Sequence, residues 1–121
     1  METTKQLIEK INQLFIDNKM EEFMDYVADD MVWEMHTSSS GHTVMRGKEE
    51  IMGMDPGNMP QVMNFHFDKT VVEGNIAIAN GTSTGTMQDG RPYEGSYCDI
   101  YEFDNGKIIK MTSYVIDNSK I

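Results

Sequence analysis

The chain has 121 residues, of which 39% are hydrophobic and 25% charged, enough for one folded domain with one core. Its formal net charge of -10 argues against nucleic acids and anionic membranes as partners, because both bind surfaces with clustered Lys and Arg. No apolar run is long enough to span a bilayer, and the one cysteine, Cys98, cannot form an internal disulfide. We therefore expect a cytoplasmic protein whose polar N-terminal segment is not a signal peptide.

Helical patterns dominate the first part of the chain. Apolar residues recur at helical spacing over residues 5–18, after a threonine that can cap the helix. A shorter helix is predicted over residues 20–27, and Asp29 and Asp30 are expected to end this helical region. A third short helix is predicted after Gly47, followed by a loop over residues 55–60 that is rich in Pro and Gly.

A short strand is predicted over residues 31–36, with residues 43–46 pairing back onto it. Trp33 and Met35 share one face of this strand, and Glu34 and His36 share the other. We expect Trp33 and Met35 to form an apolar wall. The alternative is a register shifted by one residue, in which Glu34 and His36 face the pocket, because short strands specify register weakly.

From residue 62 the pattern changes to strands, predicted over 62–73, 76–88, 91–104 and 107–117. Gly-Asn, Asp-Gly and Asn-Gly pairs separate them, and such pairs are typical of tight hairpin turns. Consecutive strands joined in this way form an antiparallel meander. The predicted fold class is therefore α+β, with three N-terminal helices packed in a curved antiparallel sheet, as a single domain over residues 1–121.

The last two strands carry the best candidate site. Odd-numbered residues share one face there, and an aspartate lies among apolar and aromatic side chains. Asp is unfavourable inside a strand, and burial would raise the pKa of Asp99 and make it an acid or hydrogen-bond donor near neutral pH. The alternative is that Asp99 faces solvent or bonds a tyrosine structurally. The expected neighbours on this face are Tyr97, Tyr101, Ser113 and Val115.

Two other strands offer polar candidates. His66 alternates with Phe65 and Phe67, so it either faces the pocket and pairs with Asp99 as a proton shuttle or points outward. Thr84 belongs to a row of alternating threonines that faces either a ligand or solvent. No metal site is predicted, because the histidines lack ligand spacing on any one element. No cofactor is predicted either, since no Gly-rich loop leads from a strand into a helix.

Several short motifs, in this order and spacing, resemble the NTF2-like superfamily, and within it the SnoaL-like and ketosteroid-isomerase-like group. They are Ala28-Asp29-Asp30, Gly47-Lys48-Glu49, Asp89-Gly90, and Phe103-Asp104 followed by Gly106-Lys107-Ile108. The resemblance covers nearly the whole chain. It implies a cone in which the curved sheet wraps the helices and leaves a deep apolar pocket for a small hydrophobic molecule. It also implies a homodimer formed sheet to sheet.

The resemblance also implies roles for individual residues. Ketosteroid isomerases use a carboxylate base, a tyrosine and a protonated aspartic acid. These positions fall here on Met35, Ile11 and Asp99, so only the acid is matched. SnoaL-like cyclases place an acid/base aspartate near the end of the last strand, where Asp117 lies about one residue further along.

The expected function is therefore a cofactor-free isomerase, cyclase or dehydratase acting on a polyketide-like or cyclic ketone-like compound. In it Asp99 donates to a carbonyl oxygen, and His66 or Asp117 moves the proton. The alternatives are a binding protein without catalysis, and a structural dimer whose pocket is filled by side chains.

Overall fold

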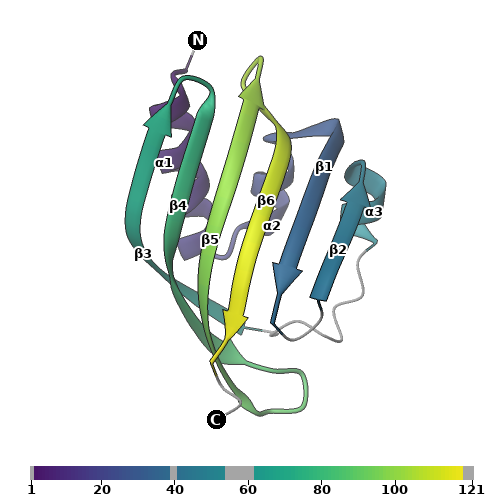
Figure 1. Cartoon of the computed structure of the whole chain (residues 1–121), viewed down its shortest axis with the longest axis vertical. Helices are drawn as coiled ribbons and strands as arrows, with labels where there is room; N and C mark the ends of the chain where they lie inside the picture. The colour runs from purple at the N-terminus through teal and green to yellow at the C-terminus, as the bar shows by residue number, and fades with distance from the viewer. Residues whose placement is uncertain (1, 39–40, 54–61, 119–121) are drawn as a thin grey trace.

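The computed structural model describes residues 2–38, 41–53 and 62–118. The expected loop over residues 55–60 lies outside this part. The elements, shown in Figure 1, are α1 (Thr4–Ile16), α2 (Met20–Met24), β1 (Val27–Thr37), β2 (Gly41–Arg46), α3 (Lys48–Met52), β3 (Val62–Glu73), β4 (Ile76–Thr86), β5 (Pro92–Asp104) and β6 (Lys107–Asp117). No helix in the described ranges is both long enough and apolar enough to cross a membrane.

Helix α1 begins with a reciprocal capping interaction. The Thr3 hydroxyl accepts a hydrogen bond from the Gln6 backbone N–H (3.2 Å), and the Gln6 side chain accepts one from the Thr3 N–H (2.9 Å). These bonds satisfy donors that helix geometry leaves without an intrahelical partner. The predicted apolar stripe is confirmed, because Leu7, Ile8, Ile11 and Phe15 are all buried.

The six strands form one sheet in the order β2-β1-β6-β5-β4-β3. Strands β3 to β6 form the predicted antiparallel meander. Strand β1 departs from the expectation, because it runs parallel to β6. After β1 the chain passes through β2 and α3 and re-enters the sheet at its far edge as β3. It returns to the side of β1 only with β6. Because no tight turn connects β1 to β6, the two strands need not be antiparallel.

Strand β1 also begins earlier than predicted. Asp29 and Asp30 belong to the strand and do not end the preceding helical region. The backbone N–H of Ile108 donates to the Tyr26 carbonyl (2.7 Å), and Val27 pairs with Ile108. The register then shifts between Val27 and Val32. Pairing with β6 thus draws this segment into the sheet despite its two acidic residues.

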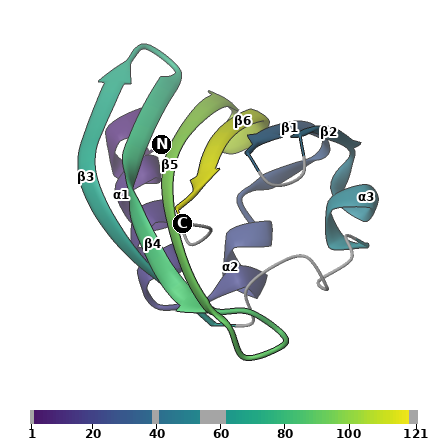
Figure 2. The same ribbon diagram turned by 60° about the horizontal axis from the view of Figure 1, so that its bottom comes forward.

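The sheet curves around α1 and α2, as Figure 2 shows, while α3 packs at the β1–β2 end. Part of the bend lies where the β3–β4 register shifts between Phe67 and Lys69. A Cβ on Gly81 would lie 2.0 Å from the His66 carbonyl oxygen, so only glycine permits this close approach. We call the side facing α1 and α2 the inner face of the sheet and the other side the outer face.

The core fills the cone near the β5–β6 turn. That turn is the predicted Asn-Gly pair, with φ of 51° at Asn105 and 76° at Gly106. Each aliphatic side chain fully buried here contributes about 1.5–3 kcal/mol of hydrophobic stabilisation. The side chains with 0% exposure include Ile8, Ile11, Phe23, Met31, Tyr101 and Ile108.

Candidate functional site

Beside the core, the inner face of the sheet and α1 enclose a cavity of about 260 Å³. Its walls are mainly apolar and include four methionines, whose flexible thioethers suit an adaptable surface. Exposed Asn18 and Met20 also line it, so the cavity reaches the surface between α1 and α2. A volume slightly below the roughly 300–1,000 Å³ common for drug-sized ligands favours a small molecule. The other apolar residues in the walls are Phe15, Phe65, Met35, Met63, Met111 and Val115.

One carboxyl group lines this cavity among the described residues, that of Asp99 on β5. Its direct cross-strand neighbour is Ser113 on β6, and the two side chains are hydrogen-bonded. The Ser113 oxygen also accepts a hydrogen bond from the indole N–H of Trp33 (2.9 Å). The Ser113 hydroxyl keeps its own hydrogen while its oxygen accepts from Trp33, and it donates this hydrogen to the Asp99 carboxylate. Three strands therefore orient this carboxyl group.

Burial raises the pKa of Asp99 to about 7, because the charged carboxylate loses hydration in the apolar cavity. The hydrogen bond from Ser113 acts in the opposite direction and lowers the pKa by stabilising the carboxylate. A group that titrates near neutral pH can both accept and return a proton under ordinary conditions. The sequence-based expectation of a raised pKa for Asp99 thus agrees with its surroundings.

Two tyrosine hydroxyl groups near Asp99, those of Tyr97 and Tyr101, are buried without a hydrogen-bond partner among the residues that the structure describes. Burial raises the pKa of both phenols, and the neighbouring Asp99 charge raises it further, so both remain protonated donors. Tyr97, with 8% of its surface exposed, lines the cavity, whereas Tyr101, with 0%, does not. Leaving a buried hydroxyl unpaired costs about 1–3 kcal/mol, which a ligand oxygen beside Tyr97 would recover.

A second tyrosine that lines the cavity, Tyr93, lies at the start of β5. The Tyr93 hydroxyl is hydrogen-bonded to Ser83, which is buried on β4 and also lines the cavity. A Cβ on Gly95 would lie 2.3 Å from the Tyr93 hydroxyl oxygen. Glycine at position 95 therefore leaves the space into which the Tyr93 ring folds.

Most of the predicted site residues are brought together. The predicted alternation on β5 and β6 is present, with Tyr97 opposite Val115, Asp99 opposite Ser113 and Tyr101 opposite Met111. Strand β1 adopts the register in which the apolar pair, not Glu34 and His36, faces the cavity. The predicted residues that line the cavity are Trp33, Met35, Tyr97, Asp99, Ser113 and Val115.

His66 and Thr84 are not brought into the site. Both are exposed, on the outer face of β3 and β4, and the pairing of His66 with Asp99 is not formed. On β3 the inward positions are taken by Phe65 and Phe67, which pack against the core. On β4 the inward residues are small ones, including Ala77, Ala79 and Ser83, so the row of threonines turns outward.

Asp117 and Tyr101 occupy the same alternating positions as the lining residues of β5 and β6, on the inner face, but they do not line the cavity. Asp117 pairs with Gly95 at the end of β6, and its backbone N–H donates to the Ser38 hydroxyl (2.8 Å). Its charge contributes to raising the Tyr93 pKa, so the two side chains are neighbours. Tyr101 is displaced toward the core, where it stacks on Phe103 (6.1 Å between ring centroids).

Sequence reasoning missed Tyr93 and Ser83. Tyr93 has the same odd-numbered phase as Tyr97 and Asp99, so the alternation that found them also identifies it. Ser83 shares the phase of Ala77 and Ala79, and this run of small residues indicates the inward face of β4. The lining residues from α1 and β3 carry no comparable signal, because apolar residues facing a cavity have the same pattern as apolar residues facing a core.

Comparison with solved structures finds the same fold in proteins of distant sequence. An NTF2-like protein of unknown function from Burkholderia pseudomallei is 16% identical with a TM-score of 0.77, covering 93% of this chain and 90% of that one. TerC, co-crystallised with polyporic acid, is 15% identical with a TM-score of 0.74, covering 91% and 88%. A Jannaschia protein assigned to the SnoaL-like polyketide cyclases is 15% identical with a TM-score of 0.73, covering 92% and 85%.

No protein of curated function matches the sequence significantly. The family profile of the SnoaL-like domain, in contrast, matches residues 8–111, which include the Asp99 strand and most of the sheet. The architecture agrees with this match, because the curved, unclosed sheet around α1 and α2 is that of the NTF2-like proteins. The chain therefore belongs to the SnoaL-like domain family of the NTF2-like superfamily.

Proposed function

We propose that the protein is a cofactor-free enzyme that moves a proton on a small, largely apolar carbonyl compound. Asp99 is the proton carrier, and the Tyr97 hydroxyl donates a hydrogen bond to the carbonyl oxygen. The observation that carries this proposal is a carboxyl group whose pKa is raised to about 7 inside an apolar cavity. Such groups are typical of active sites, because ordinary folding gains nothing from placing a carboxylate there.

The proposed reaction begins with the ionised form of Asp99. The carboxylate removes a proton from the carbon next to the carbonyl, and the C–H electron pair forms an enolate whose charge lies on oxygen. The Tyr97 O–H, which has no hydrogen-bond partner within the described part of the chain, stabilises that oxygen. In a substrate with a C=C bond between its β and γ carbons, this intermediate is a dienolate. Protonated Asp99 returns the proton to the γ carbon, and the carbonyl re-forms with the C=C bond moved to the α,β position. The net change is an isomerisation.

Asp99 takes both proton steps because His66 and Asp117 do not line the cavity. Ser113 holds the carboxyl group in place, and the Trp33 N–H holds Ser113. The polyporic acid bound by TerC and the polyketide cyclase assignment of the Jannaschia protein support a polyketide-like or cyclic ketone-like substrate. Met20, Met35 and Met63 supply an apolar lining suited to such rings.

The test uses a panel of small cyclic ketones and polyketide-like compounds in D₂O. Trp33 is the only tryptophan and lines the cavity, so its fluorescence reports binding. NMR then measures deuterium incorporation next to the carbonyl of each compound that binds. We expect exchange with the wild-type protein and a loss of roughly 10²–10⁴-fold in Asp99→Asn, with binding retained. Exchange that is unchanged in Asp99→Asn contradicts the proposal.

A second candidate function is ligand binding without catalysis. The observation that favours it is Met35, which lies where ketosteroid isomerases carry their base, so the cavity has a single carboxyl group among the described residues. Under this candidate a compound quenches Trp33 fluorescence saturably but exchanges no deuterium. Asp99→Asn then changes affinity by no more than a hydrogen bond, roughly 1 kcal/mol.

The proposal includes a cytoplasmic homodimer. Tyr114 and Ile116 of β6 are 47% and 57% exposed on the outer face, and apolar side chains in that position are suited to a second copy of the sheet. The lone Cys98 fits a reducing compartment. Sedimentation of the wild type against Ile116→Lys tests the dimer, and we expect the charged variant to be monomeric. A wild type that is monomeric at high concentration contradicts this part.

A further inference from the structure

We propose that Glu34, His36 and His42 form a binding site for one divalent transition-metal ion of the zinc class. The site lies on the outer face of β1 and β2, with the sheet between it and the cavity. One ligand atom from each of the three side chains lies within 4.8 Å of the other two. The inference is independent of the reaction proposed for Asp99.

The register of two strands brings these residues together. His36 on β1 and His42 on β2 are direct cross-strand partners. Glu34 precedes His36 by two residues, so it lies on the same face. Cross-strand partners have Cβ atoms about 4.5–5.5 Å apart, which suits two side chains that share an ion. Spacing along any single element cannot show this arrangement, which is why the sequence predicted no metal site.

The side chains are near the geometry that an ion requires. The Glu34 Oε2 and His36 Nε2 atoms are 3.8 Å apart, and the His36 and His42 rings stack with centroids at 4.5 Å and an angle of 4°. Tetrahedral zinc with bonds of 2.0–2.1 Å brings two ligand atoms to about 3.3 Å. His42 is exposed, so its ring can rotate out of the stack to bring its nitrogen to that distance.

His36 is the more constrained ligand. Its ring also stacks on Tyr114 of β6, with centroids at 4.9 Å and an angle of 11°, and this contact still holds the ring when His42 rotates out of the stack. A ligand held in one orientation loses less conformational entropy when it binds. Two imidazoles and one carboxylate match a common ligand set for zinc, with a fourth position left for water. The net charge of -10 adds a general attraction for cations.

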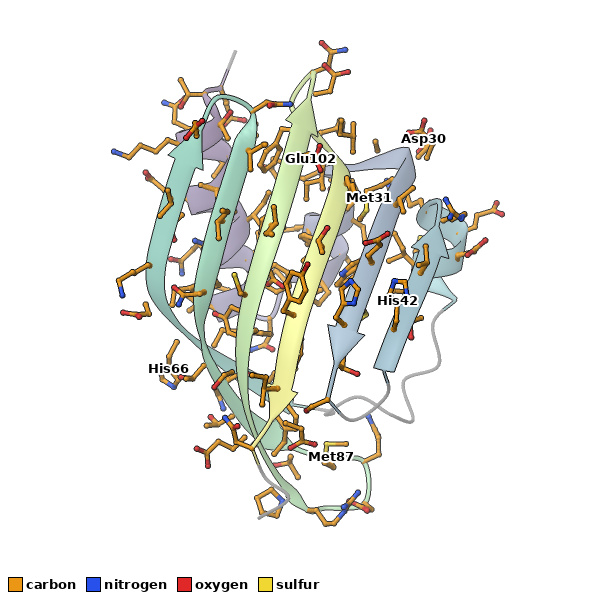
Figure 3. The ribbon with its side chains drawn as sticks, viewed as in Figure 1. Asp30, Met31, His42, His66, Met87 and Glu102 are labelled. Carbon is orange, nitrogen blue, oxygen red and sulfur yellow. The ribbon has the colours of Figure 1, made fainter. Side chains whose placement is uncertain are left out.

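The position of the site gives the ion a structural role. Strand β2 is an edge strand, and β1 carries Trp33 and Met35 on its other face. Figure 3, which views the sheet from the side away from α1 and α2, shows His42 on β2 at this edge. An ion shared by β1 and β2 would fasten the edge strand to the strand that forms part of the cavity wall.

The experiment uses metal-free protein without a histidine tag, in slightly alkaline buffer, because protons compete with metal ions for ligand atoms. Calorimetry with ZnCl₂ measures stoichiometry and affinity, and MgCl₂ serves as the hard-cation control. We expect one zinc ion per chain, a rise in melting temperature with zinc, and no heat with magnesium. Only three histidines are present, so the ¹⁵N imidazole spectrum resolves them individually. Zinc is expected to shift the His36 and His42 signals and leave His66 unchanged.

The matched variants are His36→Gln and His42→Gln against His66→Gln, which removes the one histidine outside the site. We expect each of the first two to weaken zinc binding at least roughly ten-fold, and His66→Gln to bind as the wild type does. Circular dichroism checks that each variant is folded. Absence of zinc binding to the wild type, equal affinity in His42→Gln, or zinc-induced shifts at His66 would overturn the proposal.

Discussion

The two faces of the sheet are built from the same strands but differ in polarity. On β1, Trp33 and Met35 turn inward to an apolar cavity, and Glu34 and His36 alternate with them on the outer face. Among the described residues, Asp99 supplies the one carboxyl group that lines the cavity, and burial raises its pKa. On the outer face, polar side chains lie beside one another. A shift of one residue in the register of β1 would exchange the two environments.

The largest expected effect concerns the pH dependence of stability. Asp99 has a pKa of about 7 in the native state against a normal value of 3.8, so the native protein holds this proton more tightly. The stabilisation is complete below about pH 4 and is lost as the pH rises through about 7. Relative to Asp99→Asn, the wild type should lose up to roughly 4 kcal/mol over this range, the equivalent of about three pKa units.

Urea unfolding of the wild type and Asp99→Asn at several pH values measures this difference. The asparagine has the same shape and does not titrate, so the other titrating groups cancel in the comparison. Two stability curves that run parallel between pH 4 and pH 7 would show that burial on the inner face does not control Asp99.

The next largest effect separates the two unpaired tyrosines. Tyr97→Phe removes the proposed donor to the substrate oxygen, and we expect deuterium exchange to fall roughly 10²-fold or more. The same variant should be as stable as the wild type or more stable, because a buried hydroxyl without a partner is removed. Thermal unfolding and NMR exchange measure the two effects.

Tyr101→Phe is the matched control for this prediction. Its hydroxyl is equally buried and unpaired but does not line the cavity, so its removal should leave exchange unchanged. Equal losses of exchange in the two variants would mean that Tyr97 has no special relation to the substrate.

Ser113→Ala tests how the carboxyl group is tuned. Loss of the Ser113 hydrogen bond removes the influence that lowers the Asp99 pKa, so that pKa should rise by roughly one unit. Because the ionised form is the proposed base, the midpoint of the pH–rate profile for exchange should move upward by the same amount. The fluorescence of Trp33 should also change, since its N–H loses its acceptor. A midpoint that stays in place or moves downward contradicts this role.

The smallest effects are expected on the outer face away from the histidine cluster. Thr84→Ala and His66→Gln change exposed side chains, so each should alter the free energy of unfolding by less than about 0.5 kcal/mol and leave exchange unchanged. Denaturation and NMR exchange check both. A large loss of exchange in His66→Gln would restore the proton shuttle that the sequence suggested and the geometry does not form.

The sequence alone specified much of this molecule. Helical spacing identified α1, and alternation with Gly-Asn and Asn-Gly turns identified β3 to β6, because these signals are local and agree with one another. The same alternation placed Tyr97, Asp99 and Ser113 on one face. A carboxylate inside a strand is unfavourable, so Asp99 could be singled out before any contact was known.

Only the tertiary structure decided the remainder. The parallel pairing of β1 with β6 depends on the path of the chain through the strands between them. The outward turn of Thr84 depends on which face of β4 meets the core, and alternation is identical for both choices. The pairing of His36 with His42 depends on register between strands, which no spacing within one strand records. Local sequence sets the spacing of apolar residues within each helix or strand. Packing decides which face of the element turns inward and which elements pair, and the residues of the cavity follow from that choice.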